Sequence, residues 1–234
     1  MNFGYGPYYM PYLVPWESPQ LRSGVWYPPF FPFEAPIEGW QEGTRTPIQA
    51  LDTSELVRIT PQELAALNPP NYSVPPKARF FVMRAECEDD VHKSLKYGIW
   101  TSPRGNSKLD KAFSEGPVVL VFSVKQSGIF LGVAEMVSCV DFHARFTGWY
   151  PQFSNLGFFK VKWVFVKDVP DSELKEIRLR NGMPIHKAFD ATELPNRLGC
   201  KLIKIFGSTK SQKSLLDDFN YYDVKEVQVN SFLQ

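Results

Sequence analysis

Short apolar segments that begin at residue 78 predict the strands of a folded domain. Ala78–Arg84 (ARFFVMR) is a compact apolar run after two prolines, as expected of a buried strand. The runs 117–124 (PVVLVFSV) and 129–136 (IFLGVAEM) flank the sequence Lys-Gln-Ser-Gly at 125–128, which predicts a hairpin. In the segment 158–167 (FFKVKWVFVK) apolar and basic residues alternate, which predicts a strand with one wet, positively charged face. The face of this strand expected in the core carries Phe159, Val161, Trp163 and Phe165.

Helix signals occupy three other segments. Residues 60–63 (TPQE) have the sequence of a capped helix start and precede leucines at helical spacing. Asp89-Asp90 opens a second helix that is expected to stop at Gly98. Glu193–Phe206 has leucine and isoleucine at helical spacing, with Gly207 as the expected stop. Strands and helices mix over about 140 residues, which predicts an α/β or α+β domain long enough to bury a core.

The first 76 residues differ from the rest in proline content and charge. They hold fourteen of the 20 prolines, which disfavour helices and central strands. They carry three basic and seven acidic residues, a net of −4, and leave +5 for the remainder, which favours a polyanionic partner for the folded part. We expect a low-order tail over 1–59, a short helix and linker over 60–76, a folded domain over 77–219 and a C-terminal tail over 220–234. The first tail is interpreted either as an extension without a defined partner or as a sticky segment that binds proteins.

Composition and motif content argue against a membrane protein, a metalloprotein or an enzyme. Hydrophobic content of 44% with 22% charged residues is typical of globular chains, and no run approaches 18 apolar residues. The first ten residues do not resemble a signal peptide, and three scattered cysteines indicate a reducing, intracellular compartment. No metal-binding spacing, phosphate-binding glycine loop or GxSxG motif occurs, so we expect no metal and no cofactor. A Cys/His pair that meets only in space stays open, and Asp89-Asp90 is interpreted as helix capping.

Two tryptophans lie in predicted loops among basic residues. Trp100 follows the glycine that ends the second predicted helix, and Trp149 lies in the stretch 147–151 (TGWYP), outside any periodic element. Indoles in loops that are surrounded by lysine and arginine are typical of sites that stack bases and contact phosphates. They are also typical of buried loop anchors, so these residues alone leave both interpretations open.

Several motifs between Ala78 and about Phe219 occur together in one known domain family. They are ARFFVMRAECEDDVHKSLKYGIWTS, GNSKLDKAF, GPVVLVFSVKQSGIFLGVAEM, FFKVKWVFVKDVP, IRLRNG and LLDDF. With these motifs the chain resembles the YTH domain, the reader of N6-methyladenosine in RNA, and most closely its cytoplasmic, YTHDF-type branch. The resemblance implies a PUA-like fold, an open six-stranded β-barrel surrounded by helices, without catalytic activity.

The resemblance also implies which residues bind the methylated base. Trp100 and Trp149 match the two cage indoles of the family, one a wall of the methyl pocket and the other the floor under the adenine. Asp90 matches the polar residue that hydrogen bonds the edge of the adenine ring. Glu86 occupies the position whose backbone N–H reaches the ring, and Thr101 is expected to accept the remaining N6–H through its main-chain carbonyl.

The third wall of the cage and the phosphate contacts depart from the family pattern. The wall falls on Asn155, a polar residue that would weaken the cage, and after a one-residue loop insertion Leu156 and Phe153 are candidates to close it by a small register change. Phe189 stands where relatives have a phosphate-binding arginine, with His186 and Lys187 as candidates to replace it. The basic residues expected along the RNA backbone are Arg84, Lys108, Lys125 and Lys187.

Three functional hypotheses follow. In the first, the chain binds N6-methyladenosine in single-stranded mRNA in the cytoplasm, without membrane or DNA binding, and regulates mRNA stability or translation. In the second, a degenerate YTH domain binds RNA independently of methylation. In the third, the chain acts mainly as a protein-interaction factor through residues 1–59. The branch resemblance and the lack of a basic nuclear-targeting run favour the cytoplasm, with the nucleus as the alternative location.

Overall fold

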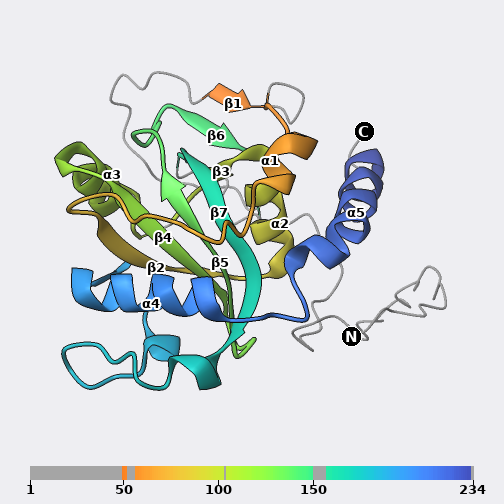
Figure 1. Cartoon of the computed structure of the whole chain (residues 1–234). Coiled ribbons are helices and arrows are strands. Elements are labelled where there is room, and N and C mark those ends of the chain that lie inside the picture. The colour runs from red at the N-terminus through yellow and green to blue at the C-terminus, as the bar shows by residue number, and fades with distance from the viewer. Residues whose placement is uncertain (1–48, 52–55, 103, 150–156, 233–234) are drawn as a thin grey trace, which may run out of the picture.

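The computed structural model describes residues 49–51, 56–102, 104–149 and 157–232 (Figure 1). Within these residues the strands are β1 (Gln49–Leu51), β2 (Arg79–Ala85), β3 (Ile99–Trp100), β4 (Val118–Val124), β5 (Ile129–Met136), β6 (Ala144–Phe146), β7 (Phe159–Pro170) and β8 (Thr192–Leu194). The α-helices are α1 (Pro61–Ala65), α2 (Glu88–Tyr97), α3 (Asn106–Glu115), α4 (Asn196–Ser208) and α5 (Phe219–Phe232). Short 3-10 helices are η3 (Asp171–Leu174), η4 (Ile185–Lys187) and η5 (Leu215–Asp218).

Six strands form one mixed sheet in the order β3-β7-β5-β4-β2-β8. Strands β2 and β4 are parallel, and the chain between them passes through α2, β3 and α3, because parallel neighbours need a long crossover. The other neighbours are antiparallel, including β4 and β5, which form the predicted hairpin around 125–128. The sheet curls among the helices in Figure 1, which confirms the predicted mixed fold of a barrel-like, open sheet surrounded by helices.

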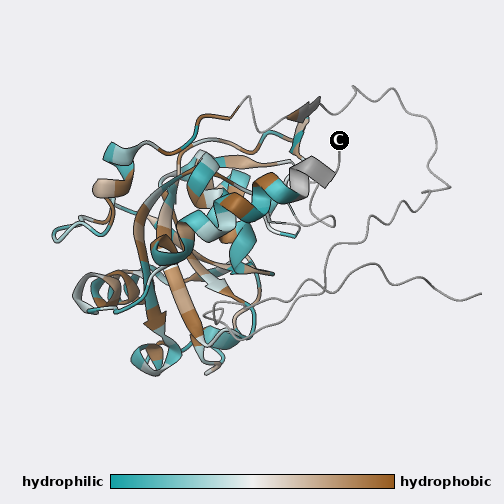
Figure 2. Cartoon of the chain, turned by 90° about the vertical axis from the view of Figure 1, so that its right-hand side faces the viewer, coloured by the Kyte–Doolittle hydropathy of each residue, from teal (hydrophilic) through white to brown (hydrophobic). Residues whose placement is uncertain are grey.

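Two hydrophobic cores lie on opposite faces of the sheet, because successive strand residues point to opposite sides. In β2, Phe81 and Met83 join the core that contains residues of α2 and α3. Phe80 and Val82 join the core that contains residues of α4. All seven residues of β4 are buried, as expected for a strand covered on both faces. In Figure 2, apolar residues gather on the strands and polar residues are frequent on the helices.

A β-bulge in β7 changes one predicted face. The first four residues of β7 alternate between buried and exposed, as the sequence predicts. Trp163 and Phe165 pair with consecutive residues of β5, so β7 has one extra residue between them. This insertion turns their side chains to opposite faces of the sheet. Trp163 lies in the predicted core, but Phe165 joins the opposite core with α4. The prediction for Phe165 was wrong because the residue pattern does not reveal an inserted position.

Helix boundaries agree with the sequence at α1 and differ at α4. Helix α1 begins with the predicted capping box, in which the Thr60 hydroxyl accepts from the Glu63 N–H at 3.2 Å. Helix α4 begins at Asn196, because Glu193 pairs with β2 as part of β8, and it continues through Gly207 to Ser208. No helix among the described residues combines the length and apolar character needed to cross a membrane.

Residues 220–232, within the segment 220–234 that was expected to be a tail, form most of α5, which contacts α2. Lys96 of α2 is buried, and its Nζ lies 2.6 Å from Asp223 Oδ1 and 2.7 Å from Glu226 Oε2. The Tyr97 hydroxyl donates to Glu226 Oε1 at 2.9 Å. Because α2 leads directly into β3, these contacts hold the element that positions Trp100.

Candidate functional site

Trp100 and Trp149 come from distant parts of the chain and meet in one aromatic cluster. Their ring centroids are 5.5 Å apart, with an angle of 72° between the ring planes. Trp100 packs edge-on against Phe122 of β4, and Trp149 packs edge-on against Phe146 of β6, each at 5.0 Å between centroids. The two indoles are only 4% and 3% exposed. Edge-to-face contacts favour defined ring orientations, so the cluster holds the two indoles at a steep angle to each other.

The end of α2 sets the position of Trp100. Gly98 follows the last helical residue with φ 62° and ψ 32°, a left-handed conformation that glycine adopts without steric cost. Its N–H donates to the Ser94 carbonyl at 2.9 Å, which completes the predicted helix stop. The chain then continues as β3, where Trp100 pairs with Phe159 of β7. The helix stop and the strand pairing together fix the backbone of this indole.

The close approach of two rings explains why a glycine precedes Trp149. A Cβ atom on Gly148 would lie 2.4 Å from the ring of Phe146. Any larger residue would displace that ring, which is the surface on which Trp149 packs. The turn that follows β6 therefore depends on glycine to place the second indole.

The indoles of the cluster present buried hydrogen-bond donors. Among the described residues, none accepts a hydrogen bond from Nε1 of Trp100 or of Trp149. A buried donor without a partner costs on the order of 1–3 kcal/mol. The cluster thus combines aromatic faces with donors that a ligand can satisfy. The residues predicted to form the third wall, Phe153, Asn155 and Leu156, lie outside the described residues.

A network of polar side chains fixes the segment that follows Trp100. Asn106, the first residue of α3, donates from Nδ2 to Thr101 Oγ1 at 3.1 Å and accepts from the Ser102 N–H at 2.9 Å. All three residues are buried. The Ser102 hydroxyl donates in turn to the Asp190 carboxylate. Sequence reasoning missed Ser102 and Asn106. Asn106 stands after the N-cap Gly105, and its side chain reaches back to residues 101 and 102, a contact that helix signals do not reveal.

Asp190 joins this network to strand β2. Its Oδ1 accepts from the backbone N–H of Arg84 at 2.9 Å. Burial raises the pKa of the Asp190 carboxyl, and the hydrogen bonds from Ser102 and the Arg84 backbone oppose that rise. The Arg84 side chain donates from Nη1 to Ser123 Oγ at 2.8 Å, and burial lowers the pKa of its guanidinium. Arg84 is therefore half-buried and tied into the sheet, in contrast to a freely solvated cation.

The other predicted basic residues are exposed. Lys125 forms an ion pair with Glu86, so two residues predicted for different roles contact each other. Lys108 Nζ donates to the Ala191 carbonyl at 3.0 Å. Lys187 lies at the end of η4. The structure thus brings Lys108 to the loop that contains Asp190 and pairs Lys125 with Glu86.

Asp90 occupies the buried first turn of α2, where the sequence predicts a helix start. One potential ligand atom from each of Cys87, Asp89 and Asp90 lies within 4.8 Å of the others. Burial, followed by the nearby carboxylates, raises the pKa of the Cys87 thiol, and Asp89 lies 2.6 Å from Lys93. Asp89 is ion-paired with Lys93 and the three residues lie at the start of α2, so the group is interpreted as acidic residues at the positive end of a helix.

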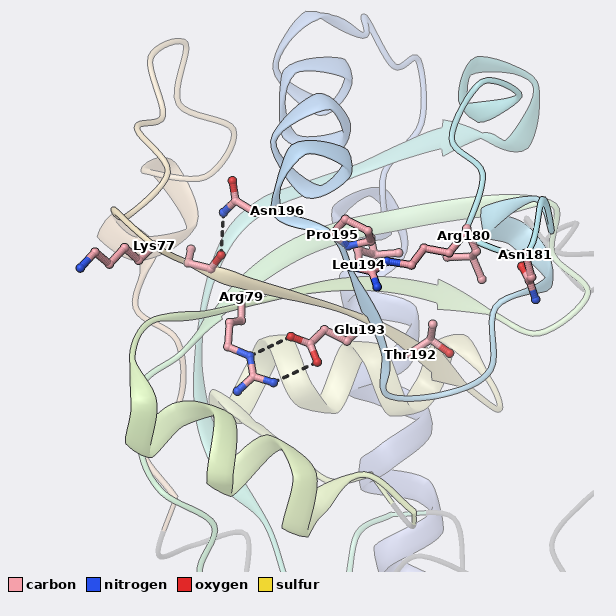
Figure 3. Close-up of a pocket in the computed structure, with 11 residues that line it drawn as sticks. Lys77, Arg79, Arg180, Asn181, Thr192, Glu193, Leu194, Pro195 and Asn196 are labelled. Carbon is pink, nitrogen blue, oxygen red and sulfur yellow. Dashed lines mark hydrogen bonds and ion pairs between the residues drawn. The ribbon is translucent and has the colours of Figure 1, made fainter.

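An open groove of about 1010 Å³ lies outside the aromatic cluster, along β8 and the adjoining ends of β2 and α4 (Figure 3). Arg79 within it lies 2.8 Å from Glu193 Oε1 and is also paired with Glu115. The Asn196 side chain donates to the Ala78 carbonyl at 2.8 Å. These polar groups are paired with other groups of the protein, and none of the predicted site residues lines the groove.

The curled mixed sheet with helices on both faces, together with two indoles supported by phenylalanines, defines a small α+β domain with an aromatic site. Residues 78–207 match the family model of the YT521-B-like domain, YTH, and the chain belongs to the YTH family. This match confirms the family predicted from the sequence motifs.

Relatives place the chain near the YTHDF-like branch, as predicted. It is 39% identical over 195 residues to human YTH domain-containing family protein 3, covering 77% of this chain and 32% of that protein. It is 43% identical over 160 residues to YTH domain-containing protein ECT3 of Arabidopsis thaliana, covering 64% and 32%. The chain thus spans about a third of these relatives. The YTH domain of Zygosaccharomyces rouxii MRB1, solved in complex with N6-methyladenosine RNA, superimposes with a TM-score of 0.57 at 33% identity, covering 62% of this chain and 96% of that one.

Proposed function

We propose that this chain binds N6-methyladenosine in single-stranded RNA, with Trp100 and Trp149 as two walls of the methyl pocket. The observation that carries the proposal is the buried pair of indoles 5.5 Å apart in a chain of the YTH family. The similar YTH domain of Zygosaccharomyces rouxii MRB1 was solved in complex with N6-methyladenosine RNA, which supports the same ligand here. Binding single-stranded RNA agrees with the need to unstack the base before it enters a pocket.

The remaining contacts are proposed from the family resemblance. Asp90 and the backbone of Glu86 and Thr101 hydrogen bond the adenine. Asn106 and Ser102 hold the main chain at Thr101, which supports its use as a backbone acceptor. The residues proposed to contact the RNA backbone are Arg84, Lys108, Lys125 and Lys187. Leu156 and Asn155 are the proposed third wall. Lys125 would exchange Glu86 for a phosphate on binding, because both are ion-paired in the free protein.

The chemistry of the pocket favours the methylated base. Adenine has two N6–H donors, whereas the methylated base has one donor and an apolar methyl group. Burying the methyl group contributes about 0.8 kcal/mol. A second N–H placed against an indole without an acceptor costs on the order of 1–3 kcal/mol. Stacking on the indole is common to both bases and does not discriminate. The methyl burial and the unsatisfied N–H both favour the methylated base, and together they predict a preference of about 20- to 600-fold.

The cellular role belongs to the same proposal. The chain would act on mRNA in the cytoplasm and influence its stability or translation, without catalysis and without DNA or membrane binding. Residues 1–59 would recruit protein partners, since proline and aromatic residues are concentrated there. Deleting residues 1–48, which keeps β1 and its pairing with β6, is expected to abolish partner recruitment and to leave RNA affinity unchanged. Recruitment that persists would contradict this assignment of the tail.

The pocket can be tested with aromatic variants at matched positions. Trp149→Ala should abolish the preference for a methylated over an unmethylated short RNA, and Trp149→Phe should retain part of it. Phe206→Ala is the control, because Phe206 is also fully buried but lies in the core around α4. Both alanine variants are expected to lose about 3–5 kcal/mol of stability, so calorimetric titrations are made at low temperature after folding is checked by circular dichroism. A methyl preference that survives in Trp149→Ala would contradict the proposal.

A further inference from the structure

Phe189 is the most exposed aromatic residue in the described part of the chain, with 77% of its surface open to solvent. It lies between η4 and β8, in the loop that contains Asp190. An exposed aromatic ring that is held in place offers an apolar face on which a nucleic-acid base can stack.

The backbone on both sides of Phe189 is fixed. The carbonyl of Phe189 accepts from the Thr192 N–H at 3.2 Å. The neighbouring Asp190 carboxylate accepts from the Arg84 backbone and from the Ser102 hydroxyl. The next residue, Ala191, is buried and accepts from Lys108 Nζ at 3.0 Å. The ring of Phe189 is therefore presented to solvent from a short, tightly bonded loop.

This loop is attached to the segment that continues from the aromatic cluster. Ser102, which donates to Asp190, is two residues beyond Trp100. A Cβ on Gly105 would lie 2.3 Å from the Cβ of Ala191, which shows how closely the two loops approach. Phe189 therefore directly precedes Asp190, the residue that contacts the segment just after Trp100.

Two lysines lie near Phe189, beside the carboxylate of the adjacent Asp190. Lys187 is exposed two residues before it. Lys125 is close enough to Asp190 to lower the pKa of that carboxyl by its charge. An exposed aromatic face among cations is the combination that binds single-stranded nucleic acid, because the ring stacks on a base while the cations contact phosphates.

We infer that Phe189 stacks on the base of a nucleotide that flanks the methylated adenosine. The inference rests on the proposed function, since it assigns a second contact to the same RNA. It predicts that part of the affinity for RNA comes from stacking, which is less sensitive to salt than a phosphate contact at this position. It also predicts that this contact does not read the methyl group.

A double-mutant cycle on the full chain tests the stacking contact. The probes are nine-nucleotide RNAs with one central adenosine, methylated or not, and with either flanking base intact or replaced by an abasic site. Phe189→Ala should weaken binding of the intact RNA by about 5- to 150-fold. With the stacked base removed on one side, the same substitution should have no further effect, because the two changes remove one interaction. The methyl preference should be the same in Phe189→Ala as in the unmodified protein.

Two further variants separate stacking from charge and from general surface effects. Phe189→Arg should restore, at low salt, the affinity lost in Phe189→Ala. It should also make the slope of log affinity against log salt more negative by about 0.7, as expected for one additional phosphate contact on a single strand. Val224→Ala, an exposed apolar position on α5, should not change binding. Equal affinities of Phe189→Ala and the unmodified protein for intact RNA, or effects that simply add in the cycle, would overturn the inference. If the unmodified protein binds methylated and unmethylated RNA equally, the proposed function is overturned instead. The cycle can then still be measured on unmethylated RNA.

Discussion

Replacing Lys96 by methionine should strongly destabilise the domain, because it leaves a carboxylate buried between α2 and α5. Lys96 is 3% exposed and Glu226 is 6% exposed, and they are joined at 2.7 Å. Removing one partner of a buried ion pair typically costs 3–5 kcal/mol. The Tyr97 hydroxyl still donates to Glu226 after the substitution, and the side chain of Asp223 is 37% exposed and remains hydrated. We therefore expect the lower end of that range, about 3 kcal/mol.

Unfolding in urea, followed by tryptophan fluorescence, measures this loss. With a slope of about 2 kcal/mol per molar urea, Lys96→Met should move the midpoint down by about 1.5 M. Lys201→Met is the control, because Lys201 and Glu176 form a solvent-exposed pair at 2.5 Å and such pairs contribute little. The double variant Lys96→Met with Glu226→Leu should recover most of the loss, since no charge is then left buried. Equal midpoints for Lys96→Met and Lys201→Met would refute this account of how α5 is held.

Two other predictions concern stability at α2. Burial lowers the pKa of His92 from 6.5 to about 4, although Asp223 lies 3.5 Å from its Nε2. Between pH 4 and pH 6.5 the unfolded chain therefore binds a proton at His92 that the folded chain does not bind. The free energy of unfolding is highest above pH 6.5 and falls by up to about 3 kcal/mol as the pH is lowered towards 4. His92→Phe should flatten urea midpoints measured across this interval, and an unchanged pH dependence would contradict the assignment. Gly98→Ala should cost about 1–2 kcal/mol, because φ is 62° and a Cβ would lie 3.3 Å from the Val161 carbonyl oxygen. Gly207→Ala, within α4 and with open space around it, should instead stabilise by about 0.5–1 kcal/mol; the same sign in both thermal melts would be inconsistent with this reasoning.

Strong local signals made most of the fold predictable. The apolar run of β2 follows two prolines, and the hairpin of β4 and β5 carries a polar turn with glycine. The stop of α2 at Gly98 follows from its left-handed conformation. In each case neighbouring residues contain the information, and the later packing agrees with it.

Helix α5 could not be predicted in the same way. Its apolar side chains do not gather on one face, so no helical stripe is visible in the sequence. Its described polar contacts reach residues about 130 positions earlier, from Glu226 to Lys96 and from Tyr222 to Glu88. Local periodicity does not encode such contacts. The bulge that turns Phe165 to the other core is equally invisible, since one inserted residue reverses the alternation beyond it.

The candidate site was predictable in part. Trp100 and Trp149 stood out because both were expected in loops among basic residues. The structure brings the two indoles together, but Trp100 lies in the short strand β3 and not in a loop. Phe122, which supports Trp100, comes from a strand whose residue pattern marks it only as core. Phe146, which supports Trp149, comes from the short strand β6, which the sequence did not predict. The role of Asp190 as a link between β2 and the segment after Trp100 depends on a contact across 88 positions, which the sequence does not display.

The most direct test of the central claim is a titration of the full chain with two short single-stranded RNAs that differ by one N6-methyl group. The pocket proposed around Trp100 and Trp149 predicts a preference of about 20-fold or more for the methylated RNA. Equal affinities, with binding that weakens steeply as salt increases, would contradict the claim and would favour an RNA-binding domain that does not read the methyl group.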